Sequence, residues 1–268
     1  MKKVILSSIS FLIFFIIATI IYLSTIGYET DKFNQLLEKN ISSNVPNTKI
    51  NIDKIKIKIN IKNLSFFVTT SKPIIEYHNN NININKIDAF INLKSLLIGK
   101  PKIEKINIVS NEIEVNDIKN IVKYQKPSNL KKFFLNDVKK GKIKVKLDLN
   151  LKNNEIKNYE IDGTVKDFFA NVQNINLTKM SFIYSIKQNN GEVDNITGNV
   201  NGLNINYGNI EFENSKSLVI KGDIESDLNL NKIDINKTFK NEILNSFEKI
   251  QLSGKIQSLF KINFDKTL

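Results

Sequence analysis

The stretch KINIDKIKIKINIKN, from Lys49 to Asn63, places an isoleucine on almost every second residue. Such alternation is typical of a β-strand with one apolar and one solvated face, because successive side chains point to opposite sides. Asp53-Lys54 interrupts the alternation and shifts its phase by one residue, which predicts a turn or bulge between two strands. We therefore expect a chain built mainly from half-buried strands.

The same alternation recurs through most of the 268 residues. Before residue 140, strands are expected at 50–52, 55–61, 66–69, 74–77, 82–84, 89–93, 103–108 and 113–115. A meander of strands is expected from Gly141 to about Ile235, and further strands from 250 to 264. Asparagine and glycine accept positive φ and predict hairpin turns at Asn153-Asn154, Asn190-Gly191, Asn201-Gly202 and Gly208-Asn209.

Helices are expected to be few and short after residue 28. Apolar residues at helical spacing follow candidate start signals at Thr30-Asp31, Asp117, Pro127-Ser128 and Asn236 or Thr238. A single helical turn is expected from Lys94 to Ile98. About four apolar residues per helix cannot cover all the apolar strand faces. The apolar faces can then be covered in three ways: the sheet closes on itself as a sandwich or barrel, it oligomerises, or it holds lipid acyl chains.

An uncharged, almost wholly apolar run extends from Val4 to Ile26. At 1.5 Å per residue it would span roughly 34 Å, which is enough to cross a bilayer. A cleaved signal peptide is the alternative, but the run exceeds the usual apolar length and no convincing cleavage site follows. We expect an uncleaved anchor with Lys2 and Lys3 on the cytoplasmic side, so that the rest of the chain is exported.

Composition disfavours several classes of function. The net charge is +12, and every basic residue is lysine, which lowers the odds of sequence-specific nucleic-acid binding. The lysine excess fits attraction to anionic lipid head groups, although an AT-rich genome would also produce it. The chain has no cysteine, and its one histidine, His78, lies among asparagines in an expected surface loop. We find no catalytic, metal-binding or cofactor-binding motif and expect no enzyme and no cofactor.

The order of several short phrases resembles the N-terminal region of bacterial AsmA-like proteins. The anchor is followed by YETD at 28–31, then INLKSLLIGKPKIEKINIV at 91–109 and NEIEVND at 111–117. Later phrases of the same kind are YEIDGTVKD at 159–167 and ITGNVNG at 196–202. The resemblance implies a fold like that of chorein-type bridge proteins, in which a long β-sheet curls into a hydrophobic groove. This chain is shorter than the large members of the family.

The expected fold class is mainly β with a few short helices: an N-terminal transmembrane helix, then a long, curled antiparallel sheet. The expected domains are an anchor (1–27), an AsmA-like α/β segment (28–140) and a β-meander groove segment (141–268) that continues in a longer protein. The hypothesised lining of the groove is Ile55, Ile57, Ile59, Ile61, Ile91, Leu93, Ile143, Val145, Leu147, Leu149, Phe182, Tyr184, Ile186, Leu203 and Ile205.

The resemblance implies a single-pass protein of the bacterial inner membrane that projects into the periplasm. Its implied role is phospholipid transport toward the outer membrane and envelope biogenesis, with phospholipids, the inner membrane and outer-membrane or envelope assembly proteins as partners. The alternative is an envelope assembly scaffold that has a closed β-sandwich core and carries no lipid. No nucleic-acid partner is expected.

Overall fold

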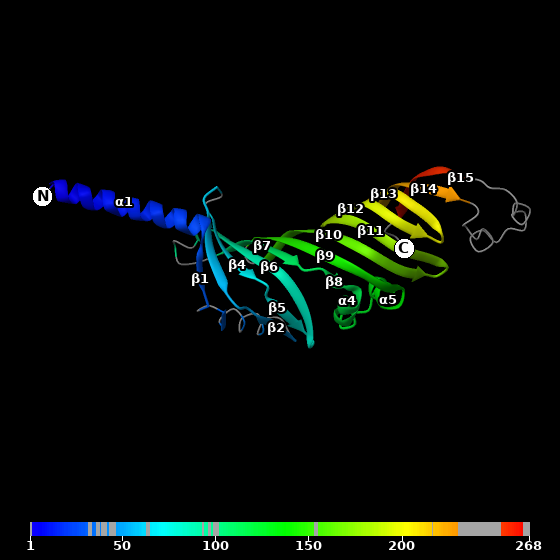
Figure 1. Ribbon diagram of the computed structural model, residues 1–268, viewed down its shortest axis with the longest axis horizontal. Helices are drawn as coiled ribbons and strands as arrows, with labels where there is room; N and C mark the ends of the chain where they lie inside the picture. Colours follow the sequence, from blue (N-terminus) through cyan, green and yellow to red (C-terminus); the bar gives the residue numbers. More distant parts are fainter. Residues whose placement is uncertain are drawn as a thin grey trace, which may run out of the picture. The chain divides into compact units, whose positions relative to one another are not determined.

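The computed structural model describes residues 2–31, 34–35, 38, 42, 47–62, 65–92, 94–95, 98, 102–152, 155–215, 217–229 and 253–264. Within them the chain forms two compact units (Figure 1). Unit 1 comprises residues 1–110 and 147–159, and unit 2 comprises residues 111–146 and 160–268. This division differs from the one expected at residue 140, because strands β9 and β10 each contribute one end to unit 1 and the other to unit 2.

Unit 1 consists of one long helix and a sheet. Its elements are α1 (Lys2–Thr25), β1 (Tyr28–Thr30), β2 (Thr48–Asn51), β3 (Ile55–Asn60), β4 (Ser65–Ser71), β5 (Ile74–Tyr77), β6 (Asn80–Asn92) and β7 (Ile103–Ser110). The strand order is β1-β3-β4-β6-β7, and β2 pairs with β5, which pairs with the first residues of β6. The strands expected at 82–84 and 89–93 are parts of the single strand β6. The first part of β6 pairs with β5, and the rest pairs with β4.

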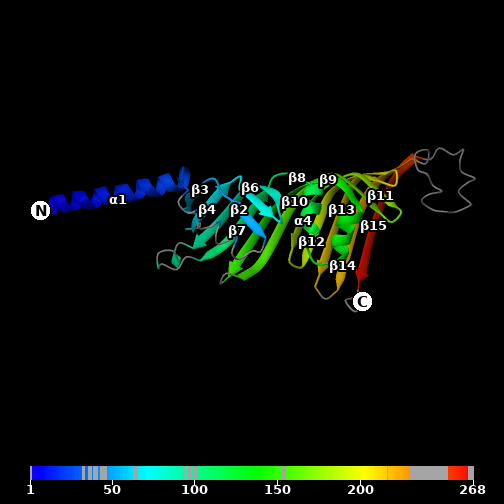
Figure 2. The same ribbon diagram turned by 90° about the horizontal axis from the view of Figure 1, so that it is seen from below.

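Unit 2 is an antiparallel meander with two short helices. Its elements are β8 (Ile113–Glu114), α4 (Val115–Val122), α5 (Asn129–Asn136), β9 (Val138–Lys152), β10 (Glu155–Val172), β11 (Ile175–Lys187), β12 (Asn190–Val200), β13 (Leu203–Asn214), β14 (Leu218–Asn229) and β15 (Ser253–Phe264). Strands β9 to β15 follow one another in chain order across the sheet (Figure 2). The described strands run from β1 to β15 without closing. The expected class, mainly β and antiparallel after an apolar N-terminal helix, is confirmed at this level.

Helix α1 passes into the sheet of unit 1 through two residues. The amides of Ile26 and Gly27 donate hydrogen bonds to the carbonyl oxygen of Tyr22, at 2.9 and 3.0 Å. Gly27 takes the left-handed conformation (φ 82°) that commonly ends a helix. Strand β1 then pairs with β3, with Tyr28 opposite Ile57. Thr30 ends this strand, and the Asn34 amide then donates a hydrogen bond to the carbonyl oxygen of Asp31 at 2.9 Å. Residues 34, 35, 38 and 42 are helical, so a helix follows Asp31 as predicted; the rest of the predicted helix lies outside the described residues.

Some sequence signals for turns and helix starts are confirmed, and others are wrong. Asn201-Gly202 forms the turn between β12 and β13. Gly208, by contrast, lies inside β13, where an added Cβ would be 3.1 Å from Cβ of Ile196, so this glycine permits close packing. Asn190 opens β12 and forms no turn. Residue 115 begins α4 with Glu114 at the N-cap, so the expected strand end and the expected cap at Asp117 are both wrong.

Each of the strands β10 to β13 gains one residue in a β-bulge at neighbouring positions. Register shifts follow Val165 in β10, Thr178 and Ser181 at the β11–β12 ladder, and Ile205 in β13. An extra residue changes the phase, so inward side chains are three residues apart at this point instead of two. The inward pairs are Val165 and Phe168, Leu177 and Met180, Val193 and Ile196, and Ile205 and Gly208.

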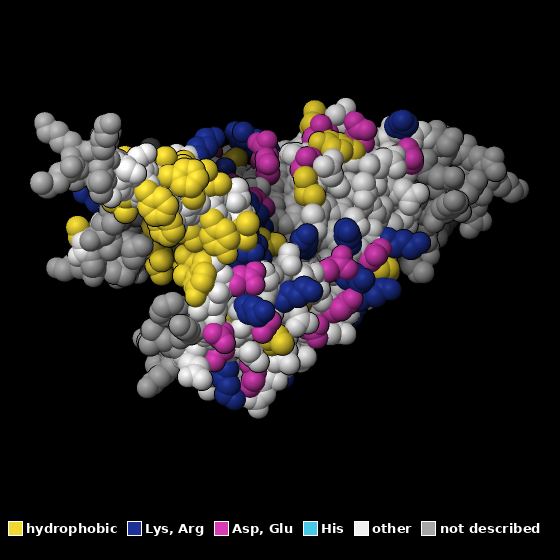
Figure 3. Space-filling model, turned by 60° about the vertical axis from the view of Figure 1, so that its left-hand side comes forward, with side chains coloured by type: hydrophobic (Ala, Val, Ile, Leu, Met, Phe, Trp, Pro, Cys, Tyr) yellow, Lys and Arg dark blue, Asp and Glu magenta, His cyan; other side chains and the backbone are white. Residues whose placement is uncertain are grey.

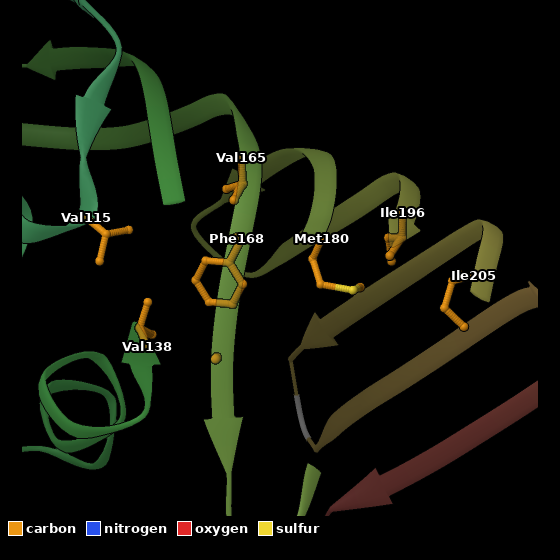
Figure 4. Packing of buried hydrophobic residues seen from close by; sticks show 8 residues of the cluster. Val115, Val138, Val165, Phe168, Met180, Ile196 and Ile205 are labelled. Carbon is orange, nitrogen blue, oxygen red and sulfur yellow. The ribbon is translucent and has the colours of Figure 1, made fainter. Parts of the chain in front are cut away.

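Helices α4 and α5 cover one part of the unit 2 sheet, next to these bulges. Val115 at the start of α4 and Val138 at the start of β9 lie beside Phe168 (Figure 4). Partly buried Phe133 and Phe134 of α5 pack against the same group. We call this group the helix-covered cluster; its buried members are Val115, Val138, Val165, Phe168, Ala170, Met180, Ile196 and Ile205.

Replacing Ser128 with alanine should destabilise α5. The Ser128 hydroxyl oxygen accepts a hydrogen bond from the Lys131 amide at 3.1 Å, as the helix-start prediction at Pro127-Ser128 requires. Loss of such a cap costs about 1 kcal/mol. Hydrogen exchange of the α5 amides in the full chain should become correspondingly faster. Ser128→Asp, which can also cap, should retain protection, and equal exchange in Ser128→Ala and the parent would contradict this role.

Candidate functional site

Two rows of facing residues cross the sheet of unit 2 on the face that carries the helix-covered cluster. Directly opposite residues of antiparallel strands share a face, so the ladders define each row. The first row is Ile161, Ile186, Gly191, Phe212, Ile220 and Ile262. The second row is Gly163, Tyr184, Val193, Ile210, Gly222 and Phe260. We call these twelve residues the open rows.

The open rows are wholly apolar apart from the tyrosine hydroxyl, yet none of their residues is buried. Eleven are half-buried, and Ile262 is 44% exposed. In the neighbouring helix-covered cluster, by contrast, Val115 and Val138 are 1% and 0% exposed. The same sheet face is therefore sealed at one end and accessible at the other, as far as the described residues show. Accessible, contiguous apolar surface of this kind marks an interaction site more often than a scattered exposed residue does.

Three aromatic rings in the open rows lie over glycines of the adjacent strand. Tyr184 faces Gly163, Phe212 faces Gly191, and Phe260 faces Gly222. A Cβ atom added to any of these glycines would overlap the ring opposite. The rings therefore lie along the sheet instead of standing away from it, which is how aromatic residues cover glycine in sheets. The result is an accessible apolar surface in which these rings cover the glycines.

The hydroxyl of Tyr184 is hydrogen-bonded to the backbone of the neighbouring strand β9. It donates a hydrogen bond to the carbonyl oxygen of Lys144 at 3.4 Å, across Gly163. Burial raises the pKa of Tyr184, and the negative charge of Asp162 adds to the effect. The phenol is therefore neutral and able to donate at neutral pH. This contact gives the one polar side-chain group of the open rows a hydrogen-bond partner in the backbone.

Unit 1 repeats the arrangement of a sealed and an accessible end. Ile50, Ile52 and Ile55 form a buried cluster under the β2–β5 ladder. Two rows cross the other end of the same sheet: Ile57, Val68, Ala89 and Ile106, and Ile59, Phe66, Ile91 and Ile103. None of these eight is buried, and Ile103 is 38% exposed. The accessible end is the end at which α1 joins the sheet, since Tyr28 lies opposite Ile57.

The hypothesised lining residues fall into distinct environments. Ile57, Ile59 and Ile91 lie in the unit 1 rows, and Tyr184 and Ile186 lie in the open rows. Ile57 and Tyr184 also pack against the buried cluster of their unit. Ile143, Phe182 and Leu203 pack against the helix-covered cluster, whereas Val145, Leu147 and Leu149 are half-buried in β9. Ile55 and Ile205 are 1% and 8% exposed, so they have little surface left for a ligand. Ile61 lies in the turn after β3, and Leu93 lies outside the described residues.

Sequence reasoning missed most of the open rows. Their unpredicted apolar members are Ile161, Val193, Ile210, Phe212, Ile220, Phe260 and Ile262. The available signal was a glycine that occupies an apolar position of an alternating run, as Gly163 does between Ile161 and Val165. Such a glycine marks a close approach by another group, here an aromatic ring.

The opposite face of unit 2 is charged. Ion pairs such as Lys146–Asp162 (3.3 Å) and Lys187–Glu160 (3.3 Å) cross its strands. A hydrogen bond from the backbone of Asn195, and a second from the Tyr207 hydroxyl (3.0 Å), lower the pKa of Asp194. A hollow of about 410 Å³ lies on this face beside Lys144, Thr164 and Ile183. Its lining includes the Lys146–Asp162 pair and the exposed side chain of Ile183.

The described residues contain no cluster of three histidines or carboxylates that could hold a metal ion. His78 lies in the β5–β6 turn with its ring against Tyr77, and its Nε2 is 3.4 Å from Nδ2 of Asn47. In α1, residues Ser7–Thr25 are long and apolar enough to cross a membrane, and the rest of the structure buries none of them (Figure 3).

No family model, curated protein or solved structure matches this chain. The resemblance to AsmA-like proteins therefore remains a prediction based on its sequence phrases.

Proposed function

We propose that this chain is an inner-membrane-anchored, periplasmic AsmA-like protein that binds phospholipid acyl chains on its apolar sheet faces. Its role would be phospholipid transport and envelope biogenesis. The observation that carries the proposal is the pair of half-exposed apolar faces, one in each unit, beside ends that are sealed by protein. Acyl chains match this surface because they are as apolar as isoleucine and need no hydrogen-bond partner.

The attachment of α1 supports a lipid as the ligand. If α1 spans the bilayer, only Ile26 and Gly27 separate its end from β1, which pairs with β3. Ile57 and Ile59 are then the first apolar residues that a lipid leaving the membrane meets. The proposed mechanism is passive. Acyl chains lie on the apolar rows, while the head group stays at the margin of the sheet, where water and lysine side chains solvate it.

The lysines at the N-terminus support the proposed orientation. Lys2 and Lys3 precede the apolar run, and positive residues remain on the cytoplasmic side. Both sheet units would then lie in the periplasm of a bacterium with two membranes. The curled groove of the resembled family also belongs to this proposal, and the flat-lying rings of Tyr184, Phe212 and Phe260 suit its floor.

Site-specific photo-crosslinking in living cells tests the ligand. Benzoylphenylalanine in place of Phe212 or Tyr184 in the full chain should capture phospholipid, identified by mass spectrometry of the adduct. The neighbouring positions Glu211 and Ser185 point to the opposite face of the same strands and serve as matched controls. We expect several-fold less lipid at the controls.

Two outcomes would count against this function. Capture of a protein at Phe212 and Tyr184, without lipid, would favour the alternative of an assembly scaffold whose apolar face is covered by a partner. Lipid capture that is equal on both faces would overturn the apolar rows as the binding site.

A further inference from the structure

One end of the unit 1 sheet lies where α1 ends. Because Tyr28 is opposite Ile57, the C-terminal end of β3 adjoins the helix. The ladders then place the start of β4, the end of β6 and the start of β7 at the same end of the sheet. Figures 1 and 2 both show these strand ends beside the C-terminus of α1.

The β9 and β10 ends in unit 1 belong to the same edge. The Lys105 ammonium contacts Asp148 at 3.0 Å, which aligns the start of β7 with the second half of β9. Asn150 donates to the side chain of Asn158 at 2.7 Å, which aligns β9 with β10. Lys152 and Ile156 follow at the α1 end of these strands. We call the described residues of this edge the proximal rim.

Exposed isoleucines gather on the proximal rim. Ile61, Ile98, Ile103 and Ile156 are 51%, 68%, 38% and 58% exposed. Among the described residues at the opposite end of the unit 1 strands, only Ile74 is a comparably exposed large apolar residue, at 42%. A single exposed isoleucine is ordinary on a soluble surface. Four from three separate connections, all at the end of the sheet where α1 joins it, are not.

Lysines accompany these isoleucines. Lys62, Lys102 and Lys152 are exposed next to Ile61, Ile103 and the β9–β10 connection. The carboxylates nearby are Glu104, which accepts a hydrogen bond from Asn92 at 2.8 Å, Glu155, and Glu29, which pairs with Lys56 at 3.0 Å. Apolar tips flanked by lysine match the membrane interface, where the tips enter the acyl boundary and ammonium groups meet phosphates.

We infer that the proximal rim is a second membrane contact, which rests on an anionic phospholipid surface and inserts its isoleucines beside α1. The inference depends on the part of the proposed function in which α1 spans a bilayer. It does not depend on lipid transport. The contact would hold unit 1 against the leaflet, with the rows that begin at Ile57 and Ile59 open toward the lipid.

The absence of cysteine makes the contact measurable with single-cysteine variants of the full chain. Ile61→Cys and Ile156→Cys would carry an environment-sensitive fluorophore in phosphatidylcholine vesicles with phosphatidylglycerol. Ile74→Cys, 42% exposed at the far end of the same unit, is the matched control. Ile13→Cys reports the insertion of α1. We expect a blue shift and several-fold stronger quenching by spin-labelled lipid at the two rim positions than at residue 74.

The outcomes separate the rim from the anchor. If residue 13 is quenched but residues 61 and 156 are quenched no more than residue 74, the rim contact is overturned and the anchor is supported. No quenching at residue 13 would overturn the anchor and the rim together.

The anionic part of the inference has its own test. With the fluorophore at residue 156, the combined change Lys62→Gln and Lys102→Gln should reduce quenching several-fold, as should vesicles without phosphatidylglycerol. Lys49→Gln and Lys72→Gln, at the far end of the strands, should not. Quenching that is unchanged by both treatments would overturn the preference for anionic lipid.

Discussion

Replacing Phe14 and Ile17 together with lysine is expected to release the chain from the membrane. Both side chains lie near the middle of the apolar segment of α1, and they are 70% and 50% exposed in the structure. A lysine at the centre of a membrane helix costs about 2.5–3.5 kcal/mol on insertion scales, so two would cost about 5–7 kcal/mol. Because no described part of the protein covers α1, the loss cannot be offset by internal packing.

The measurement is the share of the chain that floats with vesicles and resists alkaline extraction. The double change Phe14→Leu and Ile17→Leu is the matched control, since it alters the same positions but keeps them apolar. It should behave as the parent does. If the lysine variant floated equally well, α1 would not be the anchor, and binding would have to come from another surface.

The membrane helix and the existence of most strands could be predicted from the sequence, because both depend on local pattern. The length of the uncharged apolar run indicates a membrane-spanning helix. Alternation of apolar and polar residues indicates a strand, whichever strands pair with it. The start of α5 was also predictable, because Ser128 caps the helix through a contact three residues away.

The sequence does not predict where the alternation of inward and outward side chains changes phase within a strand. The bulges in β10, β11 and β12 place Asp167, Lys179 and Asn195 at positive φ (47°, 52° and 53°). Asparagine and aspartate enter this region readily, but a lysine carries no such signal. What stabilises the bulges is the packing of inward residues such as Phe168 and Met180 on neighbouring strands, which is a tertiary effect.

The distinction between sealed and open apolar faces could not be predicted either. Ile55 and Ile57 occupy equivalent positions in one alternating run, yet Ile55 is 1% exposed and Ile57 is half-buried. The difference arises because the β2–β5 ladder lies over one end of the strand only. Alternation reports which face is apolar, and only the remaining elements decide what covers it.

Phe168→Ala should lower the free energy of unfolding of unit 2 by about 3–5 kcal/mol, as for a large aromatic residue in a core. Phe168 is 9% exposed, lies within the helix-covered cluster and contacts the ring of Phe182 edge-on, with 6.5 Å between centroids. The measurement is hydrogen exchange of β10 and β11 amides in the full chain, because a chain of two units need not unfold in one step.

Ile186→Ala in the open rows is the informative partner of this variant. Its half-buried side chain has no described protein above it, so in lipid-free protein the loss of protection should be much smaller than for Phe168→Ala. With phospholipid present, Ile186→Ala should lose the protection that bound acyl chains add to the parent, whereas Phe168→Ala should cost the same in both conditions. Equal destabilisation by the two substitutions without lipid would mean that protein covers the open rows, and the scaffold function would then be favoured.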